Sequence, residues 1–317
     1  MGLATREAYG KALVELGREN KDIVVLDADL SKSTKTADFA KENKDRFINV
    51  GIAEQNLMGI SAGLASYGKI PFASTFAVFA SGRAFEIVRN SICYPNLNVK
   101  IAATHAGITV GEDGGSHQSI EDIAIMSSLP NMTVIVPADE EETRQVIKKA
   151  VEFNGPIYIR LGRLAAKDIF DSSYDFEIGK GRVLREGKDI TLIGTGMTTS
   201  IILEAANELA LDGIEVNVIH MPTIKPIDED IIVEAAKKTK NIITVEEHSI
   251  IGGLGDRVCS VTSREYPVKV NKIGIEDVFG QSGTPNELLE YYGLTVDNIK
   301  AVVKTHCKDR EYNTLMK

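Results

Sequence analysis

The amino-acid sequence predicts an α/β protein of two domains, in which a doubly wound, mostly parallel six-stranded sheet precedes a smaller α/β domain. Short apolar runs alternate with longer helical patterns in the first half, which places helices on both faces of a parallel sheet. A polar stretch then interrupts the alternation, which restarts at residue 190. A chain of 317 residues has room for two domains of ordinary size. We expect domains over 1–170 and 189–317 with a linker over 171–188.

The first domain is expected to begin with an amphipathic helix in MGLATREAYGKALVEL, followed by six strands. The strands are expected in IVVLDA (23–28), RFINV (46–50), KIPFAST (69–75), NVKIAAT (98–104), MTVIVP (132–137) and PIYIRL (156–161). Helices are expected between most of them, over 54–67, 80–93, 119–128 and 139–153. Runs as short and apolar as these are typical of strands that a parallel sheet buries on both faces.

The second domain repeats the alternation on a smaller scale. Strands are expected over 190–196, 215–221, 241–247 and 268–275, and helices over 198–211, 228–238 and 253–265. The last stretch, TPNELLEYYGLTVDNIKAVVKT, predicts two helices joined by a turn. Strand order does not follow from alternation alone.

The composition narrows the class of protein. The formal net charge of −9 argues against nucleic acid as the main partner, because phosphate backbones bind basic surfaces. A few local arginines can still hold an anionic small substrate. Cys93, Cys259 and Cys307 form no C-x-x-C pair, which argues against a disulfide framework and a thiolate zinc site. We find no signal-peptide pattern and no run of about 18 apolar residues, and we expect a cytoplasmic protein without a membrane partner.

Charged, imidazole and aromatic side chains gather at the expected carboxyl ends of the strands, where open parallel sheets bind ligands. They are Asp27 and Asp29 at the end of the first strand, Glu54 after the second, Phe76 and Phe79 after the third, His105 at the end of the fourth and Arg163 after the sixth. The loop GEDGGSHQSIED (111–122), with Asp113 and His117, follows His105. Each residue alone has an ordinary explanation as part of a surface loop. Together they indicate a binding site at this edge.

Glu54 opens an apolar helix that is rich in small residues, NVGIAEQNLMGISAGLASYG. One interpretation is a glutamate that completes the helix cap near Gly51. The other is a partly buried carboxylate that shares a proton with a nitrogen heterocycle. The spacing alone does not decide between them.

His105 and His117 are two of the five histidines, and they flank the glycine-rich loop. A metal site would need a third ligand and tighter spacing, so we expect no metal ligands here. The stretch could be a solvated turn between a strand and a helix. It could also be a flexible loop that directs both imidazoles at a substrate.

Taken together, these motifs resemble the C-terminal part of transketolase, a thiamine diphosphate enzyme, over essentially the whole chain. The most specific match is THAGITVGEDGGSHQSIED (104–122), which is similar to the family's A-T-H-D-x-x-x-x-G-E-D-G-P-T-H-Q-P-I-E. Further matches are ATR (4–6), LDADLSKS (26–33), NVGIAEQ (49–55), STFAVF (74–79), SLPNMTVIVPAD (128–139), RLGR (160–163) and FGQSGTPNELLEYYG (279–293). The resemblance implies a thiamine pyrimidine-binding domain followed by a transketolase C-terminal domain.

The resemblance also implies roles for individual residues. Glu54 matches the glutamate that bonds the aminopyrimidine of thiamine and favours the imino tautomer, whose nitrogen removes the C2 proton. Phe76 and Phe79 match aromatics that pack on the pyrimidine, and Asp29 matches an acid near the thiamine. The third aromatic of the family is Gly82 here, and the usual R-E-H is A-E-Q (53–55), so the pocket departs from the family pattern.

The substrate residues are implied in the same way. His105, Asp113 and His117 match residues that contact the hydroxyls of the donor sugar, and the two histidines match residues that assist proton transfer. The family's clamp on the substrate phosphate is matched by Arg6, Ser33 and Arg163, and the planar fork of arginine suits that task.

The family holds the cofactor diphosphate through Mg²⁺ on an N-terminal domain that carries a G-D-G…N motif. The first residues here already match the start of the pyrimidine domain. We therefore expect the second subunit of a split transketolase that acts on sugar phosphates. Thiamine diphosphate would bind between this chain and a partner N-terminal subunit, and the partner would ligate Mg²⁺ in an α2β2 heterotetramer. The chain alone is expected to be inactive.

Three alternatives stay open. The β subunit of 2-oxoacid dehydrogenases has a similar G-I-A-E-Q motif but a different histidine loop. Deoxyxylulose-phosphate synthase shares D-G-x-x-H-Q but continues with G-A-F-D, where this chain has SIED (119–122). A non-catalytic subunit that binds sugar phosphates is the third, and Glu54, His105 and His117 argue against it, because a binding protein needs no proton-sharing glutamate.

Overall fold

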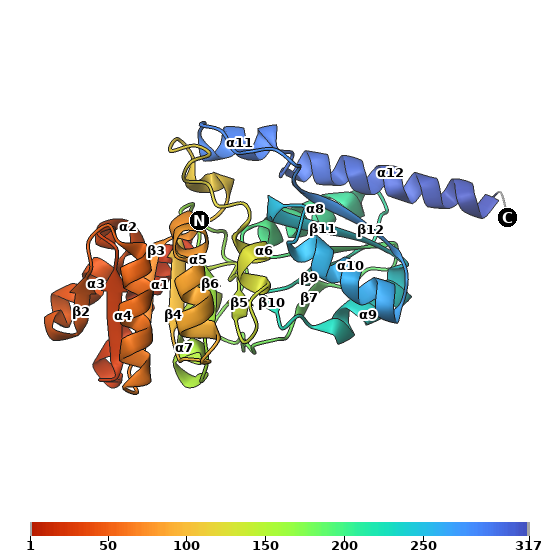
Figure 1. Cartoon of the computed structure of the whole chain (residues 1–317). Helices are drawn as coiled ribbons and strands as arrows, with labels where there is room; N and C mark the ends of the chain where they lie inside the picture. Colours follow the sequence, from red (N-terminus) through yellow and green to blue (C-terminus); the bar gives the residue numbers. More distant parts are fainter. Residues whose placement is uncertain (1, 316–317) are drawn as a thin grey trace.

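Two α/β domains lie side by side in the computed structural model, which describes residues 2–315 (Figure 1). Residue 1 and residues 316–317, at the outer ends of the two expected domains, lie outside the described part. The six strands expected in the first domain are present as β1 (Ile23–Asp27), β2 (Phe47–Asn49), β3 (Ile70–Phe76), β4 (Lys100–Thr104), β5 (Thr133–Ile135) and β6 (Ile157–Arg160). The predicted α/β fold class is therefore confirmed.

The first sheet has the order β10-β5-β6-β4-β3-β1-β2. The six expected strands pair in parallel. The seventh, β10 (Thr223–Lys225), comes from the second domain and pairs antiparallel with β5. The sheet thus has seven strands where the sequence predicted six. A strand of three residues has no periodicity of its own to detect, and only the docking of the two domains creates this pairing.

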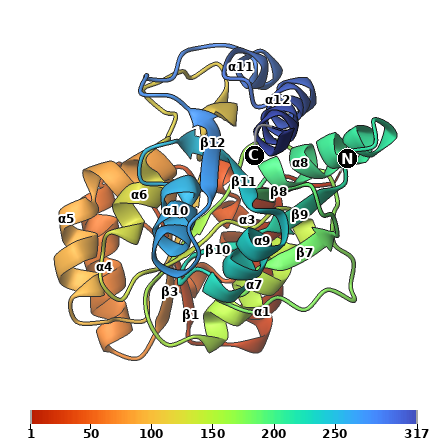
Figure 2. The same cartoon turned by 90° about the vertical axis from the view of Figure 1, so that its right-hand side faces the viewer.

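Helices cover both faces of this sheet (Figure 2). One face carries α1 (Thr5–Glu19), α3 (Thr36–Glu42) and α7 (Glu140–Glu152), and the other carries α4 (Glu54–Ser66), α5 (Phe85–Ile87) and α6 (Asp122–Ser127). The single helix expected over 80–93 is irregular, because α5 lies between two π-helical turns, Phe79–Arg83 and Val88–Cys93. π-helical turns insert one extra residue and are frequent at functional sites.

The strand β1 shows how the sequence builds this layered core. Ile23 and Val25 pack with the residues of α1 and α7, whereas Val24 and Leu26 pack with those of α4 on the opposite face. Side chains alternate between the faces of a strand, so a continuous apolar run fills two cores at once. All five residues of β1 are buried, and the last of them is Asp27.

The second domain contains a five-stranded sheet of order β12-β11-β8-β9-β7. Its strands are β7 (Arg182–Arg185), β8 (Ile190–Gly194), β9 (Val216–His220), β11 (Asn241–Ser249) and β12 (Lys269–Ile275). Its helices are α8 (Thr198–Leu211), α9 (Glu229–Thr239), α10 (Leu254–Glu265), α11 (Pro285–Tyr291) and α12 (Val296–Leu315). Within residues 2–315, no helix is both long and apolar enough to cross a bilayer.

Strand β7 lies inside the segment 171–188, which the sequence led us to expect as a linker. It pairs antiparallel with β9 at the edge of the second sheet. None of its four residues is fully buried. A strand so exposed carries little of the apolar pattern by which strands are recognised, which explains why the sequence did not reveal it.

Strand β1 lies between β2 and β3, so the chain reverses its direction across the first sheet at this point. In open parallel sheets, the crevice beyond the carboxyl ends of the strands at such a reversal is the usual place for a ligand. The end of β3 and the segments that follow β1 and β4 carry most of the residues singled out from the sequence.

Candidate active site

Four of the predicted residues follow or end strands that are consecutive neighbours in the sheet. Along the order β6-β4-β3-β1, these are Arg163 after β6, His105 after β4, Phe76 at the end of β3 and Asp29 after β1. All four strands are parallel, so their carboxyl ends meet at one edge. Residues that are distant in the sequence are therefore brought to a common edge.

Two phenylalanines and two histidines form an aromatic cluster at this edge. The rings of Phe76 and His105 stack with centroids 3.9 Å apart, and Phe79 stacks on Phe76 at 6.0 Å. His117 meets the ring of Phe79 edge-on at 5.5 Å and that of Phe76 at 6.4 Å. The glycine-rich loop thus carries His117 back to the phenylalanine pair against which His105 stacks.

His105 is almost fully buried and has a positive φ of 58°, which is uncommon for a residue with a side chain. Arg6 Nη1 lies 3.4 Å from His105 Nε2, and Thr104 Oγ1 lies 2.9 Å from His105 Nδ1. Because arginine can only donate, Nε2 accepts and the ring proton is on Nδ1. Burial, with the positive charges of Arg6 and Arg163, lowers the pKa of His105 to about 3. The imidazole is therefore neutral at neutral pH.

Two arginines border His105. Arg6 Nη1 donates to the backbone carbonyl of Ser33 at 2.9 Å, which places Ser33 next to Arg6 through its main chain. Burial lowers the pKa of Arg6, and its Nε is buried without a hydrogen-bond partner among the described residues. Arg163 bonds to the carbonyl of Val110 and lies 3.4 Å from Glu112 Oε2. Arg6 has donor capacity to offer a ligand.

Asp27, which the sequence placed at this edge of the sheet without a specific role, holds the loop that presents Ser33. Its buried carboxylate accepts hydrogen bonds from the Leu30 backbone and from the hydroxyls of Thr34 and Thr36, at 2.6–2.9 Å. Thr34 ends the short helix α2 (Ser31–Thr34). Burial raises the pKa of Asp27. The D-x-D pattern after β1 could have suggested that one aspartate faces inward and the other outward.

Glu54 is the first residue of α4 and is 2% exposed. Its two carboxylate oxygens each lie 2.9 Å from Nη1 of Arg83. The guanidinium of Arg83 lies over the ring of Phe79, 4.4 Å from its centroid. The carboxylate therefore bonds a side chain across the site, whereas a capping role would place it on the free backbone N–H groups of its own helix.

Arg83 was missed by the sequence analysis, although its neighbour Gly82 was noted as the position of a missing aromatic. Arg83 ends the first π-helical turn, and a Cβ added to Gly82 would meet no atom within 4 Å. The open space at Gly82 and the planar group at Arg83 are thus adjacent. The sequence signal that could have revealed Arg83 is a positively charged residue directly after the glycine that stands in place of the family's third aromatic.

Asp29 and Asp113 are more loosely placed than the other predicted residues. Asp29 is exposed, has a positive φ of 63°, and accepts a hydrogen bond from Asn49 Nδ2 at 3.2 Å. Asp113 is exposed on the glycine-rich loop. The described contacts join neither of them to the aromatic cluster.

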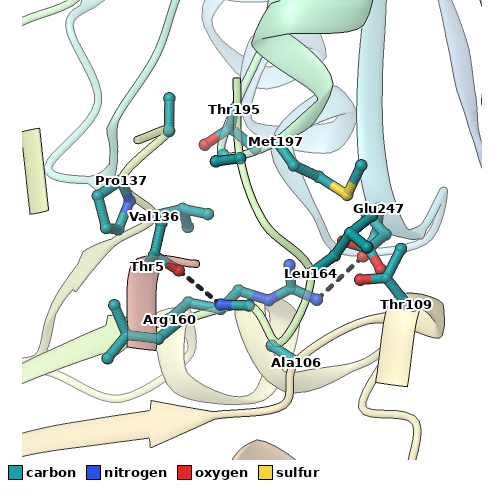
Figure 3. Close-up of a pocket in the computed structure, with 15 residues that line it drawn as sticks. Thr5, Ala106, Thr109, Val136, Pro137, Arg160, Leu164, Thr195, Met197 and Glu247 are labelled. Atoms are coloured by element: carbon teal, nitrogen blue, oxygen red, sulfur yellow. Dashed lines mark hydrogen bonds between the residues drawn. The ribbon is translucent and has the colours of Figure 1, made fainter. Parts of the chain in front are cut away.

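A cavity of about 30 Å³ lies between the two domains (Figure 3). Its walls include Ala106, the residue after His105, and Thr109 from the first domain, and Thr195, Met197 and Glu247 from the second domain. A space of this size holds about one water molecule. It is too small for a sugar, and the candidate site is the open edge and not this cavity.

Comparison with known proteins covers both domains. Residues 1–167 match the model of the transketolase pyrimidine binding domain, and residues 179–299 match that of the transketolase C-terminal domain. The chain belongs to the transketolase family. The two matched domains follow one another in the order that the sequence motifs predicted.

Three relatives show what kind of transketolase chain this is similar to. A Methanocaldococcus jannaschii protein assigned as a transketolase C-terminal section is 54% identical over 298 residues, covering 93% of each chain. A 6-deoxy-6-sulfo-D-fructose transketolase subunit from Clostridium is 40% identical and covers 93% of this chain and 91% of its own. A solved split-gene transketolase, described as an inactive β4 tetramer, is 60% identical with a TM-score of 0.91, covering 97% of this chain and 99% of that one.

Transketolases depend on thiamine diphosphate, and the residues present fit the pyrimidine ring of that cofactor. A flat nitrogen heterocycle needs apolar contacts on its faces and a hydrogen-bond partner at its edge. Phe76 and Phe79 are the aromatic rings for the first, and the buried carboxylate of Glu54, at present bonded by Arg83, is the group for the second. Among the residues that the structure describes, no three His, Cys, Asp or Glu side chains gather as ligands for a metal ion.

Proposed function

We propose that this chain is the second subunit of a split transketolase, which transfers a two-carbon ketol unit from a ketose phosphate to an aldose phosphate. The observation that carries the proposal is the meeting of His105 and His117 on the Phe76–Phe79 pair, beside the buried Glu54. A binding protein would have no use for a buried carboxylate and two imidazoles around one aromatic surface.

In this proposal Phe76, Phe79 and Glu54 hold the aminopyrimidine ring, with Asp29 nearby. Thiamine diphosphate, when bound, supplies the carbanion chemistry of ketol transfer. The carboxylate of Glu54, which Arg83 bonds in this structure, is proposed to share a proton with a ring nitrogen. Its burial excludes water from that proton, while the half-exposed Arg83 separates the carboxylate from solvent.

The remaining predicted residues are proposed to bind sugar phosphates. His105 is neutral, and its Nε2, which Arg6 Nη1 bonds at 3.4 Å in this structure, is proposed to take a hydrogen bond or a proton from a substrate hydroxyl in place of Arg6. His117 and Asp113 approach from the glycine-rich loop. Arg6 and Arg163 bind the phosphate as charge-assisted donors. Ser33 contributes through its carbonyl, which orients Arg6.

The partner is proposed to be an N-terminal transketolase subunit that binds the diphosphate through Mg²⁺, in an α2β2 heterotetramer. Two observations on relatives support it. The Clostridium protein of similar length is described as a subunit, and the solved relative is described as a split-gene transketolase whose β4 tetramer is inactive. We expect the same inactivity for this chain alone. A cytoplasmic location stays a prediction.

Reconstitution tests the proposal. The chain is mixed with the candidate N-terminal subunit, thiamine diphosphate and Mg²⁺, and two-carbon transfer from a ketose phosphate to an aldose phosphate is measured. Each subunit alone is the control. Activity of this chain alone would contradict the split arrangement. Conversion of pyruvate without ketol transfer would favour a 2-oxoacid dehydrogenase β subunit or a deoxyxylulose-phosphate synthase-like enzyme instead. Binding of sugar phosphates without turnover by the mixture would favour a non-catalytic subunit.

A further inference from the structure

Residues 107–119, which include most of the glycine-rich stretch 111–122, form a closed loop between Ala106 and Ser119. The backbone N–H of Gly107 donates to the carbonyl of Ser119 at 2.8 Å, and Ala106 and Ser119 form an isolated β-bridge. Compact loops whose ends meet are Ω-loops, which pack as units on the surface that carries them. This loop, residues 107–119, carries His117, and its residue Val110 binds Arg163. The interactions that fix this loop therefore also fix the positions of His117 and Arg163, the two proposed substrate contacts.

The first turn of the loop is held by a carboxylate of the second domain. Glu247 near the end of β11 is 5% exposed, and its Oε1 accepts the backbone N–H of Thr109 at 2.7 Å. Thr109 is the middle residue of the short 3₁₀ turn η4 (Ile108–Val110). Figure 3 shows Glu247 beside Thr109 and Arg160, at the junction of the two domains.

Gly107 shows how closely Glu247 approaches. A Cβ added at this position would lie 2.3 Å from the carboxyl carbon of Glu247, and the φ of Gly107 is +79°. Any other residue would both strain the backbone and displace the carboxylate. The contact between the domains thus requires a glycine at the start of the loop.

The far end of the loop is tied to the same strand. Arg160 Nη2 donates to the carbonyls of Ser119 and Glu247, at 3.1 and 2.9 Å. Asp122 neutralises the buried guanidinium with an Oδ2 atom 2.9 Å from Nε. The backbone N–H of Ser249 donates to the carbonyl of Ile120 at 2.8 Å. Both ends of the loop are therefore anchored to β11.

Apolar and amide contacts of residues near both ends of the loop add to this anchorage. Ile108 and Ile120 are buried in the hydrophobic core of the second domain, together with residues of β11 and α11. Gln118 Nε2 donates to the carbonyl of Gln281 at 2.9 Å and to that of Ile108 at 3.2 Å. The loop, drawn in yellow, lies against α11 in both views (Figure 1 and Figure 2).

We propose that the second domain positions the substrate loop of the active site, and that Glu247 is the positioning residue through which it acts. The inference rests on the proposed function in one respect, since the loop is taken as the sugar site. When Glu247 releases the Thr109 amide, the η4 turn loses its partner, and Val110 no longer presents its carbonyl to Arg163. The backbone N–H of His117 donates to the carbonyl of Gly114 at 2.9 Å within the same loop. His117 therefore loses its edge-on contact with Phe79 when the loop shifts.

Glu246, the neighbouring residue, offers a matched control. It is buried as well, and its carboxylate accepts hydrogen bonds from the backbone N–H groups of Leu254 and Gly255 at the start of α10, at 2.6 and 2.8 Å. Glu246 and Glu247 therefore lie on the same strand, are both buried, and both accept hydrogen bonds from backbone N–H groups. Only Glu247 bonds to the loop.

The first measurement is hydrogen exchange of the isolated full-length chain in Glu247→Gln, Glu247→Ala and Glu246→Gln. In Glu247→Ala we expect the amides of 107–118 to exchange about tenfold faster or more, because the Thr109 amide loses a charged hydrogen-bond acceptor. Exchange in α10 should stay unchanged. Glu247→Gln keeps an acceptor and should be intermediate. Glu246→Gln should reverse the pattern, with faster exchange in α10 and a protected loop. Equal exchange in the loop of all four proteins, or a uniform rise everywhere, would overturn the proposal.

The second measurement is steady-state kinetics after reconstitution. Relative to wild type, Glu247→Ala should raise KM for the phosphorylated donor about tenfold, with partial rescue in Glu247→Gln and no change of KM in Glu246→Gln. An equal loss of kcat in all variants without a change of KM would indicate a merely structural role. Exchange needs no partner, cofactor or substrate, so an inactive wild-type mixture would count against the proposed function and leave the exchange result to decide on Glu247.

Discussion

Nη1 of Arg83 lies 2.9 Å from each carboxylate oxygen of Glu54, the residue proposed to activate the cofactor. The glutamate side chain is 2% exposed, whereas the arginine side chain is 49% exposed. The same guanidinium lies 4.4 Å from the centre of the Phe79 ring. Arg83 therefore covers both the acid and one of the aromatics of the proposed pyrimidine site, with solvent on its other side.

Replacing Arg83 should destabilise the protein by leaving a buried carboxylate without its partner. For Arg83→Met, which keeps an apolar stem against Phe79, we expect the free energy of unfolding to fall by about 1–3 kcal/mol at neutral pH. Urea unfolding of the isolated chain measures it. Arg89→Met is the matched control, because Arg89 is exposed in the second π-helical turn and its side chain bonds to Asn90. Equal losses in the two variants would show that the Glu54 contact contributes nothing.

Glu54→Gln should remove the proton-sharing group while keeping the shape of the side chain. General acid–base groups contribute about 10²–10⁴-fold, and we expect the reconstituted activity to fall by at least the lower figure. Exchange of the C2 proton of thiamine diphosphate should slow in parallel. Glu86→Gln serves as the control, because Glu86 is exposed and its side chain bonds to Asn90 on the surface. C2 exchange at the wild-type rate in Glu54→Gln would refute the role of this residue.

His105 should make the protein sensitive to mild acid. Its pKa is lowered by burial to about 3 in the folded protein, from 6.5. Between these values the unfolded chain binds a proton that the folded chain does not, so the free energy of unfolding falls as the pH falls. In His105→Asn, which tolerates the positive φ, this contribution is absent. The difference in free energy between wild type and variant should shrink by up to about 1.4 kcal/mol per pH unit below pH 6. A difference in the free energy of unfolding between the two proteins that stays constant from pH 7 to 4.5 would contradict this prediction.

Arg163→Ala should weaken the binding of phosphorylated substrates. A lost charge-assisted hydrogen bond corresponds to about a 10–100-fold rise in KM for sugar phosphates, with kcat less affected. A non-phosphorylated ketose donor is the first control and should be almost unaffected. Arg144→Ala is the second, because Arg144 pairs with Glu141 on the surface of α7. A large effect of Arg163→Ala on the non-phosphorylated donor would argue against a phosphate contact.

The sequence alone predicted the fold to the level of the individual strand in the first domain. Strands such as β1 and β4 are buried on both faces, and that burial leaves continuous apolar runs that can be read directly. The edge strand β7 and the inter-domain strand β10 lack this mark. The first is exposed and the second has three residues, so the local pattern contains no comparable signal.

The candidate site was likewise predicted only in part from the sequence. Parallel strands meet at one edge, and this geometry alone allowed Phe76, His105 and Arg163 to be grouped from their positions after strands. Contacts between side chains of different elements did not follow. The pairing of Glu54 with Arg83 depends on a π-helical turn that shifts the register of its helix, which no propensity reveals.

What the sequence by itself determined is therefore the set of local structures, the edge at which the polar residues gather and, through the motifs of 104–122, the family. Only the tertiary structure decided that Arg83 bonds to Glu54 and that Glu247 holds the loop of His117. The physical reason is one of range. Apolar periodicity and turn chemistry act between neighbours in the chain, whereas a buried carboxylate is satisfied by whichever donor the packing of two elements brings within about 3 Å.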